Sequence, residues 1–280
     1  MTVVDLPARN LLAPDEPPPF EIEAHGRRWP ALLVCDHASR RIPRVLANLG
    51  LSESALQRHI AWDIGAAQLV RGLAASLEIP AVLAGYSRLV IDCNRHLEDP
   101  SSIVAESDGQ PVPGNRDVSA AQRELRARAC FLPYHRAVDQ VLGEIARGTD
   151  APALIAIHSF TPQMLSRARP WHCGILWDRD PRIAVPMLEA LRAEPGLVVG
   201  DNEPYSGRHP ADYTVDVHAD NRGWPHVCIE IRQDLITDAT RVAAWTERLA
   251  RVLEPILSVR SLYREQRFAD GGSGVNEVLR

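Results

Sequence analysis

The sequence predicts an α/β fold with a mainly parallel or mixed central sheet flanked by helices. Short, continuous apolar runs alternate along the chain with longer stretches in which apolar residues recur every three or four positions, and polar side chains follow several of the runs. Runs of the first kind suit strands buried on both faces, and the longer period is that of a helix with one apolar face. In such sheets, binding sites form beyond the carboxyl ends of the strands.

The chain is expected to form one domain between two less regular ends. Residues 1–19 end in a run of three prolines and predict an extended N-terminal arm. Residues 20–268 carry the alternating pattern, and one α/β domain can reach this length. Residues 269–280 are rich in glycine, which is typical of a flexible tail.

The individual elements follow from the same two patterns. Apolar runs predict strands at residues 30–35, 81–84, 89–92, 153–157, 173–177, 197–199 and 227–231. Helical spacing predicts helices within residues 52–77, 119–147, 183–193 and 238–257. Strands and helices therefore alternate, as in a sheet covered by helices.

Composition and charge argue against several classes of function. The net charge of −5 gives no general attraction to phosphate backbones, so nucleic acid is not an expected partner. No apolar run approaches the roughly 20 residues of a membrane-spanning helix, and the first residues lack the layout of a signal peptide. The five cysteines are odd in number and include no CxxC pair, which favours reduced thiols. We expect a soluble, cytoplasmic protein that does not bind membranes, and its oligomeric state is left open.

Two histidines stand where a site is expected. His37 comes shortly after the run 30–35, and His158 directly follows the run 153–157. Two such imidazoles with carboxylates nearby match the donors of a catalytic zinc or similar divalent metal, which needs three ligands and an open position. No HExxH pair is present, so the spacing leaves a structural role for each histidine open.

Five motifs occur in a fixed order along the chain: CDHASRRIP, AWDIGA, YSRLVIDCNR, IAIHSFTP and IEIRQDL. In this order they resemble the N-formylglutamate amidohydrolases, over roughly residues 31 to 236. The resemblance implies a phosphorylase/hydrolase-like fold related to zinc carboxypeptidases. It also implies a divalent metal cofactor, most simply zinc, and hydrolysis of an N-acyl amino acid, with N-formylglutamate giving glutamate and formate.

The resemblance makes His37 and His158 the first two metal ligands. Carboxypeptidases supply a glutamate three residues after the first histidine, but this chain has Arg40 there. Asp63 is therefore the candidate third ligand, and the alternative is a carboxylate that caps a helix. Asp36 could instead orient a ligand imidazole through its outer N–H.

Glu230 lies inside an otherwise apolar run, where an ionised carboxylate is costly unless it faces a polar site. The likeness to carboxypeptidases implies that it is the general base. Arg232 is on the same face of the strand, so the two side chains could pair or could line one cleft, where Arg232 would contact substrate.

Substrate contacts are expected from Arg88, Asn94 and Arg95, because guanidinium and amide groups together can grip a carboxylate. Salt bridging at the surface is the alternative for the arginines. A long loop over residues 204–218 could cover the site, and its His218 could bind substrate or be a plain loop histidine.

Other functions remain open. A serine hydrolase could use Ser39 or Ser159, although no GxSxG motif is present. A binding protein could keep the fold and the anion pocket without catalysis. Within the family, CDHAS replaces a Pro-His-Ser-Gly-like version of the first motif, which leaves room for another N-acyl amino acid as substrate.

Overall fold

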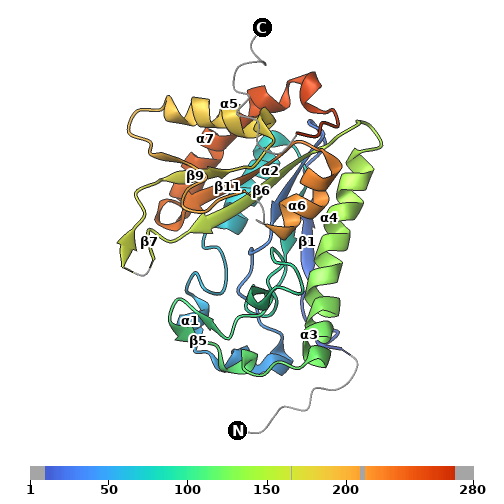
Figure 1. Cartoon of the computed structure of the whole chain (residues 1–280), viewed down its shortest axis with the longest axis vertical. Coiled ribbons are helices and arrows are strands. Elements are labelled where there is room, and N and C mark those ends of the chain that lie inside the picture. The colour runs from blue at the N-terminus through green and yellow to red at the C-terminus, as the bar shows by residue number, and fades with distance from the viewer. Residues whose placement is uncertain (1–9, 165, 209–211, 269–280) are drawn as a thin grey trace.

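The computed structural model describes residues 10–164, 166–208 and 212–268. Within them, a seven-stranded mixed sheet in the order β1-β3-β2-β6-β11-β9-β10 forms the centre, with helices packed against it (Figure 1). The strands are β1 (Phe20–Glu23), β2 (Ala31–Cys35), β3 (Ala81–Ala84), β6 (Ala153–Phe160), β9 (Cys173–Leu176), β10 (Val199–Asp201) and β11 (His226–Arg232). The helices are α1 (Glu53–Leu56), α2 (Ala66–Leu77), α3 (Ala120–Arg126), α4 (Leu132–Ile145), α5 (Pro181–Arg192), α6 (Tyr213–His218) and α7 (Ala239–Leu257). The α/β fold is confirmed.

The central strands of the sheet are parallel and the two ends depart from this pattern. β2 pairs in parallel with β3 and β6, and β6 pairs in parallel with β11. At one end β1 runs antiparallel to β3, and at the other β9 runs antiparallel to β11. The carboxyl ends of β2 and β6 therefore meet at one edge of the sheet.

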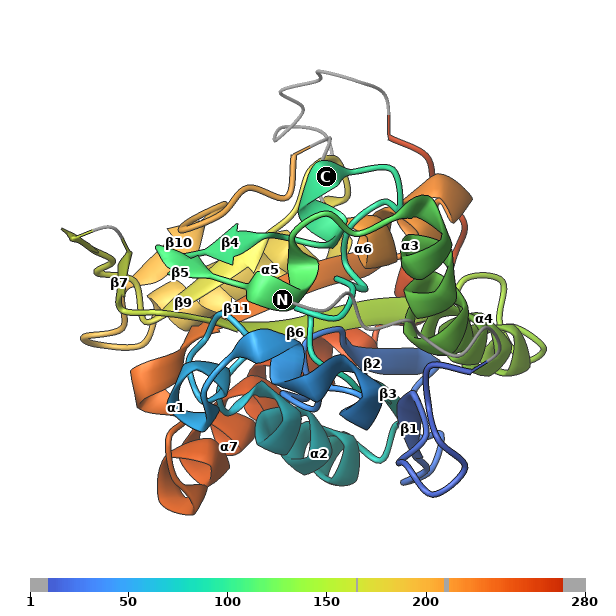
Figure 2. The ribbon, with the colours of Figure 1, turned by 90° about the horizontal axis from the view of Figure 1, so that it is seen from below.

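Side chains of alternate parity on the strands face two separate cores. Leu33 and Ile155 pack on one face with α2, α5 and α7, whereas Leu32 and Leu154 pack on the other with α4. Figure 2 shows α2 and α7 side by side beneath the sheet. Both faces of β2 and β6 are thus buried, which explains why these strands appear in the sequence as continuous apolar runs.

The predicted strand at residues 89–92 is wrong. This segment is buried but forms turns, because side chains in place of a neighbouring strand satisfy its carbonyl oxygens. Asn115 donates to Leu89 O at 2.8 Å, and Arg126 donates to Val90 O at 3.0 Å. An apolar run alone does not distinguish these two ways of being buried.

The predicted helical stretch 52–77 is broken between α1 and α2. Gly65 precedes α2 with a φ of +82°, and an added Cβ would lie 2.3 Å from Ile236 O. Only glycine fits this left-handed position against the neighbouring backbone. The break lets Asp63 face the sheet edge.

Two short hairpins lie outside the central sheet. They are formed by β4 (Glu106–Ser107) with β5 (Gln110–Pro111) and by β7 (Gln163–Met164) with β8 (Arg167–Ala168). A π-helical segment, Ala127–Phe131, joins α3 to α4.

Leu11, within the predicted N-terminal arm, is buried in a core cluster. The predicted loop 204–218 ends in α6, and its residues 209–211 lie outside the described residues, as does the predicted tail 269–280. No helix in the described parts has both the length and the apolarity to span a membrane.

Candidate active site

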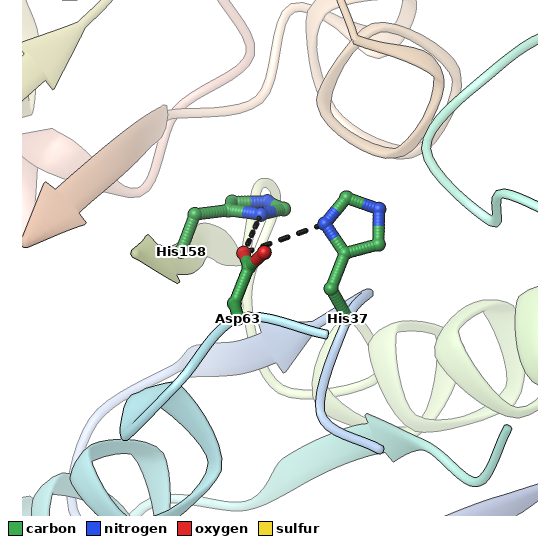
Figure 3. A group of neighbouring side chains, drawn as sticks. All are labelled: His37, Asp63 and His158. Carbon is green, nitrogen blue, oxygen red and sulfur yellow. Dashed lines mark hydrogen bonds and ion pairs between the residues drawn. The ribbon is translucent and has the colours of Figure 1, made fainter. Parts of the chain in front are cut away.

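His37, Asp63 and His158 converge at the carboxyl ends of β2 and β6 (Figure 3). His37 follows β2 and His158 lies near the end of the parallel neighbour β6. Asp63 reaches them from the loop before α2, and its N–H donates to His37 O at 2.9 Å. One ligand atom from each residue lies within 4.8 Å of the others, and all three side chains are buried. We call this group the site triad.

Asp63 stands between the two imidazoles of the site triad. Its Oδ2 lies 2.9 Å from His158 Nδ1, 3.4 Å from His37 Nδ1 and 3.2 Å from the N–H of Ser159. This carboxylate therefore does not cap α2. The helix-cap alternative does not describe what the side chain contacts.

The outer nitrogen of each imidazole faces another carboxylate. His37 Nε2 lies 2.7 Å from Asp92 Oδ1, and His158 Nε2 lies 3.2 Å from Asp36 Oδ2. His37 Nε2 donates to Asp92, and His158 Nε2 lies at ion-pair distance from Asp36, so both Nδ1 atoms face Asp63, where an ion could bind. The donor set of the site triad therefore fits a divalent metal.

Asp36 and Asp92 are held by different kinds of donor. The hydroxyls of Tyr134 and Thr214 donate to Asp36 Oδ1 at 2.8 and 2.6 Å. Asp92 Oδ2 receives Arg88 Nη2 at 2.7 Å. One carboxylate is thus supported by neutral hydroxyls and the other by a guanidinium.

These contacts set the protonation of the buried groups. Burial acts to raise the pKa of Asp36, but the hydrogen bond from His158 and its charge outweigh it and lower that pKa to about 2. Burial acts to lower the pKa of His158, yet Asp36 and Asp63 outweigh it and hold that pKa well above its usual value. The carboxylates around His158 therefore give its surroundings a negative electrostatic potential, which favours a bound cation.

Glu230 lies on β11 opposite His158 in the parallel pairing of β11 with β6. The residue is 7% exposed, and its Oε2 has no hydrogen-bond partner among the described residues. Burial raises the pKa of this carboxyl to about 8. A buried carboxyl without a partner is costly in a purely structural role, and a pKa near neutrality suits proton transfer.

The site triad and Glu230 line one cavity of about 410 Å³. Arg88, Asn94 and Arg95, the predicted substrate contacts, also line it. They flank the segment 89–92, which was expected to be a strand and instead forms turns. The structure therefore places the two imidazoles of the site triad, several carboxylates, an amide and two guanidinium groups around a common space.

The sequence model of the N-formylglutamate amidohydrolases matches residues 29–237. The chain belongs to the N-formylglutamate amidohydrolase family. It is therefore an enzyme of a hydrolase family, as the resemblance implied.

Solved structures agree with this membership. The gene product Atu2144 of Agrobacterium tumefaciens is 35% identical, with a TM-score of 0.85 over 89% of this chain and 98% of that one. The N-formylglutamate amidohydrolase of Ralstonia eutropha JMP134 is 18% identical, with a TM-score of 0.68 over 87% and 98%, which shows a shared fold. No curated protein matches this sequence.

Two predicted substrate contacts of this family member lie away from the cavity. His218 Nε2 bonds to His135 Nδ1 at 2.9 Å, and its Nδ1 bonds to Asp139 at 3.0 Å, which ties α6 to α4. Arg232 pairs with Asp234 at 2.8 Å and donates to backbone carbonyl oxygens. Neither side chain belongs among the groups that line the cavity.

Sequence reasoning missed three residues of the site. Asp92 stands within the motif YSRLVIDCNR, so its acidic side chain next to an apolar run was a usable signal. Tyr134 and Thr214 had no local signal, because one lies in the apolar face of a long helix and the other in an apparent loop. Only the folded chain brings their hydroxyls to Asp36.

Proposed function

We propose that this chain is a metal-dependent amidohydrolase that removes a formyl or related acyl group from an N-acyl amino acid. N-formylglutamate, which would give glutamate and formate, is the substrate to which the family points. The observation that carries the proposal is the site triad together with the unpartnered Glu230 carboxyl on the same cavity.

The site triad would hold a divalent ion, and zinc suits two imidazole nitrogens with one carboxylate oxygen. Asp36 and Asp92 would orient the imidazoles from behind, as carboxylates do in histidine metal sites. When bound, the ion would supply a Lewis acid that polarises the amide carbonyl and lowers the pKa of water.

Glu230 would move the protons of the reaction. It would take a proton from the attacking water and deliver it to the leaving amide nitrogen, so that the water oxygen ends in the formate. Its burial among charged groups of both signs places its pKa where a carboxyl can both accept and donate near neutral pH.

Asn94 and Arg95 would bind the carboxylate of the amino acid. Asn94 Oδ1 accepts the N–H of Thr214 at 3.1 Å, which orients the amide. Among the described residues, the Arg95 side chain donates to Asp212 at 2.9 Å and to Asn94 O, both through Nη1, so Nε and Nη2 are available to a ligand.

The contacts do not favour the serine hydrolase alternative. Ser159 Oγ donates to Ile64 O at 2.9 Å, and Ser39 Oγ accepts the N–H of Arg41 at 3.2 Å. Neither bond prepares a serine for attack by a histidine base. A binding protein without catalysis would have no need of an unpartnered buried Glu230, whose retention costs stability.

The test measures metal content by elemental analysis and formate release from N-formylglutamate, before and after chelation and metal return. We expect stoichiometric metal and activity that falls on chelation and returns with zinc. The Glu230→Gln variant should keep the metal and lose roughly 10²- to 10⁴-fold in kcat. Glu124→Gln, at an exposed position on α3, is the matched control and should match wild type. Wild-type activity in Glu230→Gln would contradict the assigned base, and absence of metal with no rescue would favour a binding protein.

A further inference from the structure

A substrate with two carboxylates needs two cationic contacts, and the arginines that line the cavity are already engaged. Arg88 lies between Asp92 Oδ2 at 2.7 Å and Asp63 Oδ1 at 3.7 Å. Arg95 pairs with Asp212 at 2.9 Å and has nitrogens left for a single further carboxylate. A second ligand carboxylate therefore requires another cation.

Arg169 is not itself among the described residues that line the cavity, but its guanidinium contacts two that are, Tyr205 and Met164. Within the described residues its side-chain bonds go to Tyr205 Oη at 2.9 Å and Met164 Sδ at 3.2 Å, and neither partner is a carboxylate. Its Cζ lies 4.8 Å from the centre of the Tyr205 ring and 5.9 Å from that of Phe160. The aromatic faces fix the guanidinium plane without neutralising its charge.

Tyr205 connects this guanidinium to the cavity. Both Tyr205 and Met164 line the cavity that holds the site triad. Because Arg169 donates to the phenol oxygen, the phenol hydrogen is free to donate to a ligand. Burial also raises the pKa of Tyr205, which keeps that hydrogen in place at neutral pH. Arg169 and Tyr205 together thus offer only donors, the complement of a carboxylate.

The backbone that carries Arg169 is bonded to the side chain of Arg232. Arg232 Nη1 lies 3.4, 3.3 and 3.4 Å from the carbonyl oxygens of residues 169, 170 and 171, and its Nε pairs with Asp234 at 2.8 Å. A single charged side chain on β11 therefore fixes three consecutive peptide units. Such a support would place a binding arginine more firmly than a free loop could.

We propose that Arg169 and Tyr205 form the subsite for the side-chain carboxylate of a dicarboxylic N-acyl amino acid, with Arg232 as the residue that positions it. The inference rests on the function proposed above and specifies its substrate class. Asn94 and Arg95 take the main-chain carboxylate, and Tyr205, which lines the same cavity, presents the side-chain subsite with the Arg169 guanidinium beside it.

The test compares N-formylglutamate with N-formylglutamine, which has the same shape and lacks the second charge. In the Arg169→Met variant we expect KM for N-formylglutamate to rise roughly 10- to 100-fold with kcat largely kept. KM for N-formylglutamine should stay within about threefold, because that substrate makes no ion pair there. Arg169→Lys should restore part of the preference, and Arg167→Met, on the same hairpin, is the matched control.

Binding measured without turnover separates this inference from the proposed function. N-formylglutamate and N-formylglutamine are titrated calorimetrically into metal-loaded Glu230→Gln, with and without Arg169→Met. Selective loss of N-formylglutamate affinity supports the subsite even if wild type releases no formate, which would contradict only the proposed activity. Equal loss for both ligands, or no loss for either, or no preference for N-formylglutamate before the change, overturns the subsite. Circular dichroism confirms that each variant is folded.

Discussion

Two pairs of buried, contacting histidines differ in their surroundings. The rings of His37 and His158 lie 5.0 Å apart at the site, and those of His135 and His218 lie 5.1 Å apart between α4 and α6. All four side chains are buried, so neither ring distance nor burial distinguishes the pairs. The hydrogen-bond and ion-pair partners of the ring nitrogens distinguish the two pairs.

The site pair is enclosed by carboxylates, whereas the helix pair is mainly bonded to itself. His37 and His158 each face one acidic side chain at Nε2 and share Asp63 at Nδ1. His135 bonds to its partner ring and to Cys93 O, and burial with the neighbouring His218 lowers its pKa to about 4. Carboxylates on both sides of each ring suit the site pair to a metal, whereas in the helix pair only His218 contacts a carboxylate, that of Asp139.

The largest effect should come from removing a ring of the site pair. His158→Gln takes away one of the three proposed ligands, so metal affinity should fall by more than the roughly 10- to 100-fold typical of an outer partner. His135→Gln, the matched change in the helix pair, should keep the full metal content. Elemental analysis after dialysis measures both, and equal metal loss in the two variants would contradict the comparison.

Removing a carboxylate behind the site pair should have a smaller effect. Asp36→Asn keeps the shape but weakens the acceptor for His158 Nε2, so metal affinity should fall roughly 10- to 100-fold. Asp139→Asn, which changes the acid of the helix pair, should leave affinity unchanged. Competition with a chromogenic chelator gives both constants, and an unchanged affinity in Asp36→Asn would show that this carboxylate does not support the site.

His135 of the helix pair should make the free energy of unfolding depend on pH. The folded-state pKa of His135, about 4, is below its ordinary value of 6.5, so the unfolded chain takes up a proton first as the pH falls. Stability should therefore be full above pH 6.5 and decrease toward pH 4, by on the order of 3 kcal/mol. Urea unfolding at several pH values should show this slope in wild type and a flatter one in His135→Gln. Equal slopes would remove His135 as the cause.

The smallest effect should come from a neutral support of the site pair. Thr214→Val removes one of two hydroxyl donors to Asp36, and Tyr134 remains. One such hydrogen bond contributes about 1 kcal/mol, so metal affinity should fall by roughly threefold to tenfold. Thr214→Ser, which keeps the hydroxyl, should restore it. A loss in Thr214→Ser as large as in Thr214→Val would point to packing and not to the hydrogen bond.

The sequence predicted the parts of the molecule that depend on local pattern. The central strands were predicted because burial on both faces leaves a continuous apolar run, and His37 and His158 were found because they follow such runs within recognisable motifs. The segment 89–92 was misread because its carbonyl oxygens bond to side chains distant in sequence. His218 could not be separated from a substrate contact, because residue type does not reveal its bonds to His135 and Asp139. Contacts of this kind exist only after folding.

Arg126 on α3 shows how far from the cavity the site can be disturbed. Its guanidinium donates to the carbonyl oxygens of Val90 and Gly114 and to the side chain of Asn115, which in turn donates to Leu89 O. The cavity wall that carries Arg88 and Arg95 therefore depends on one arginine that does not line the cavity. In a random mutagenesis screen for activity, changes at Arg126 would be grouped with active-site changes, and a library restricted to cavity residues would never sample them.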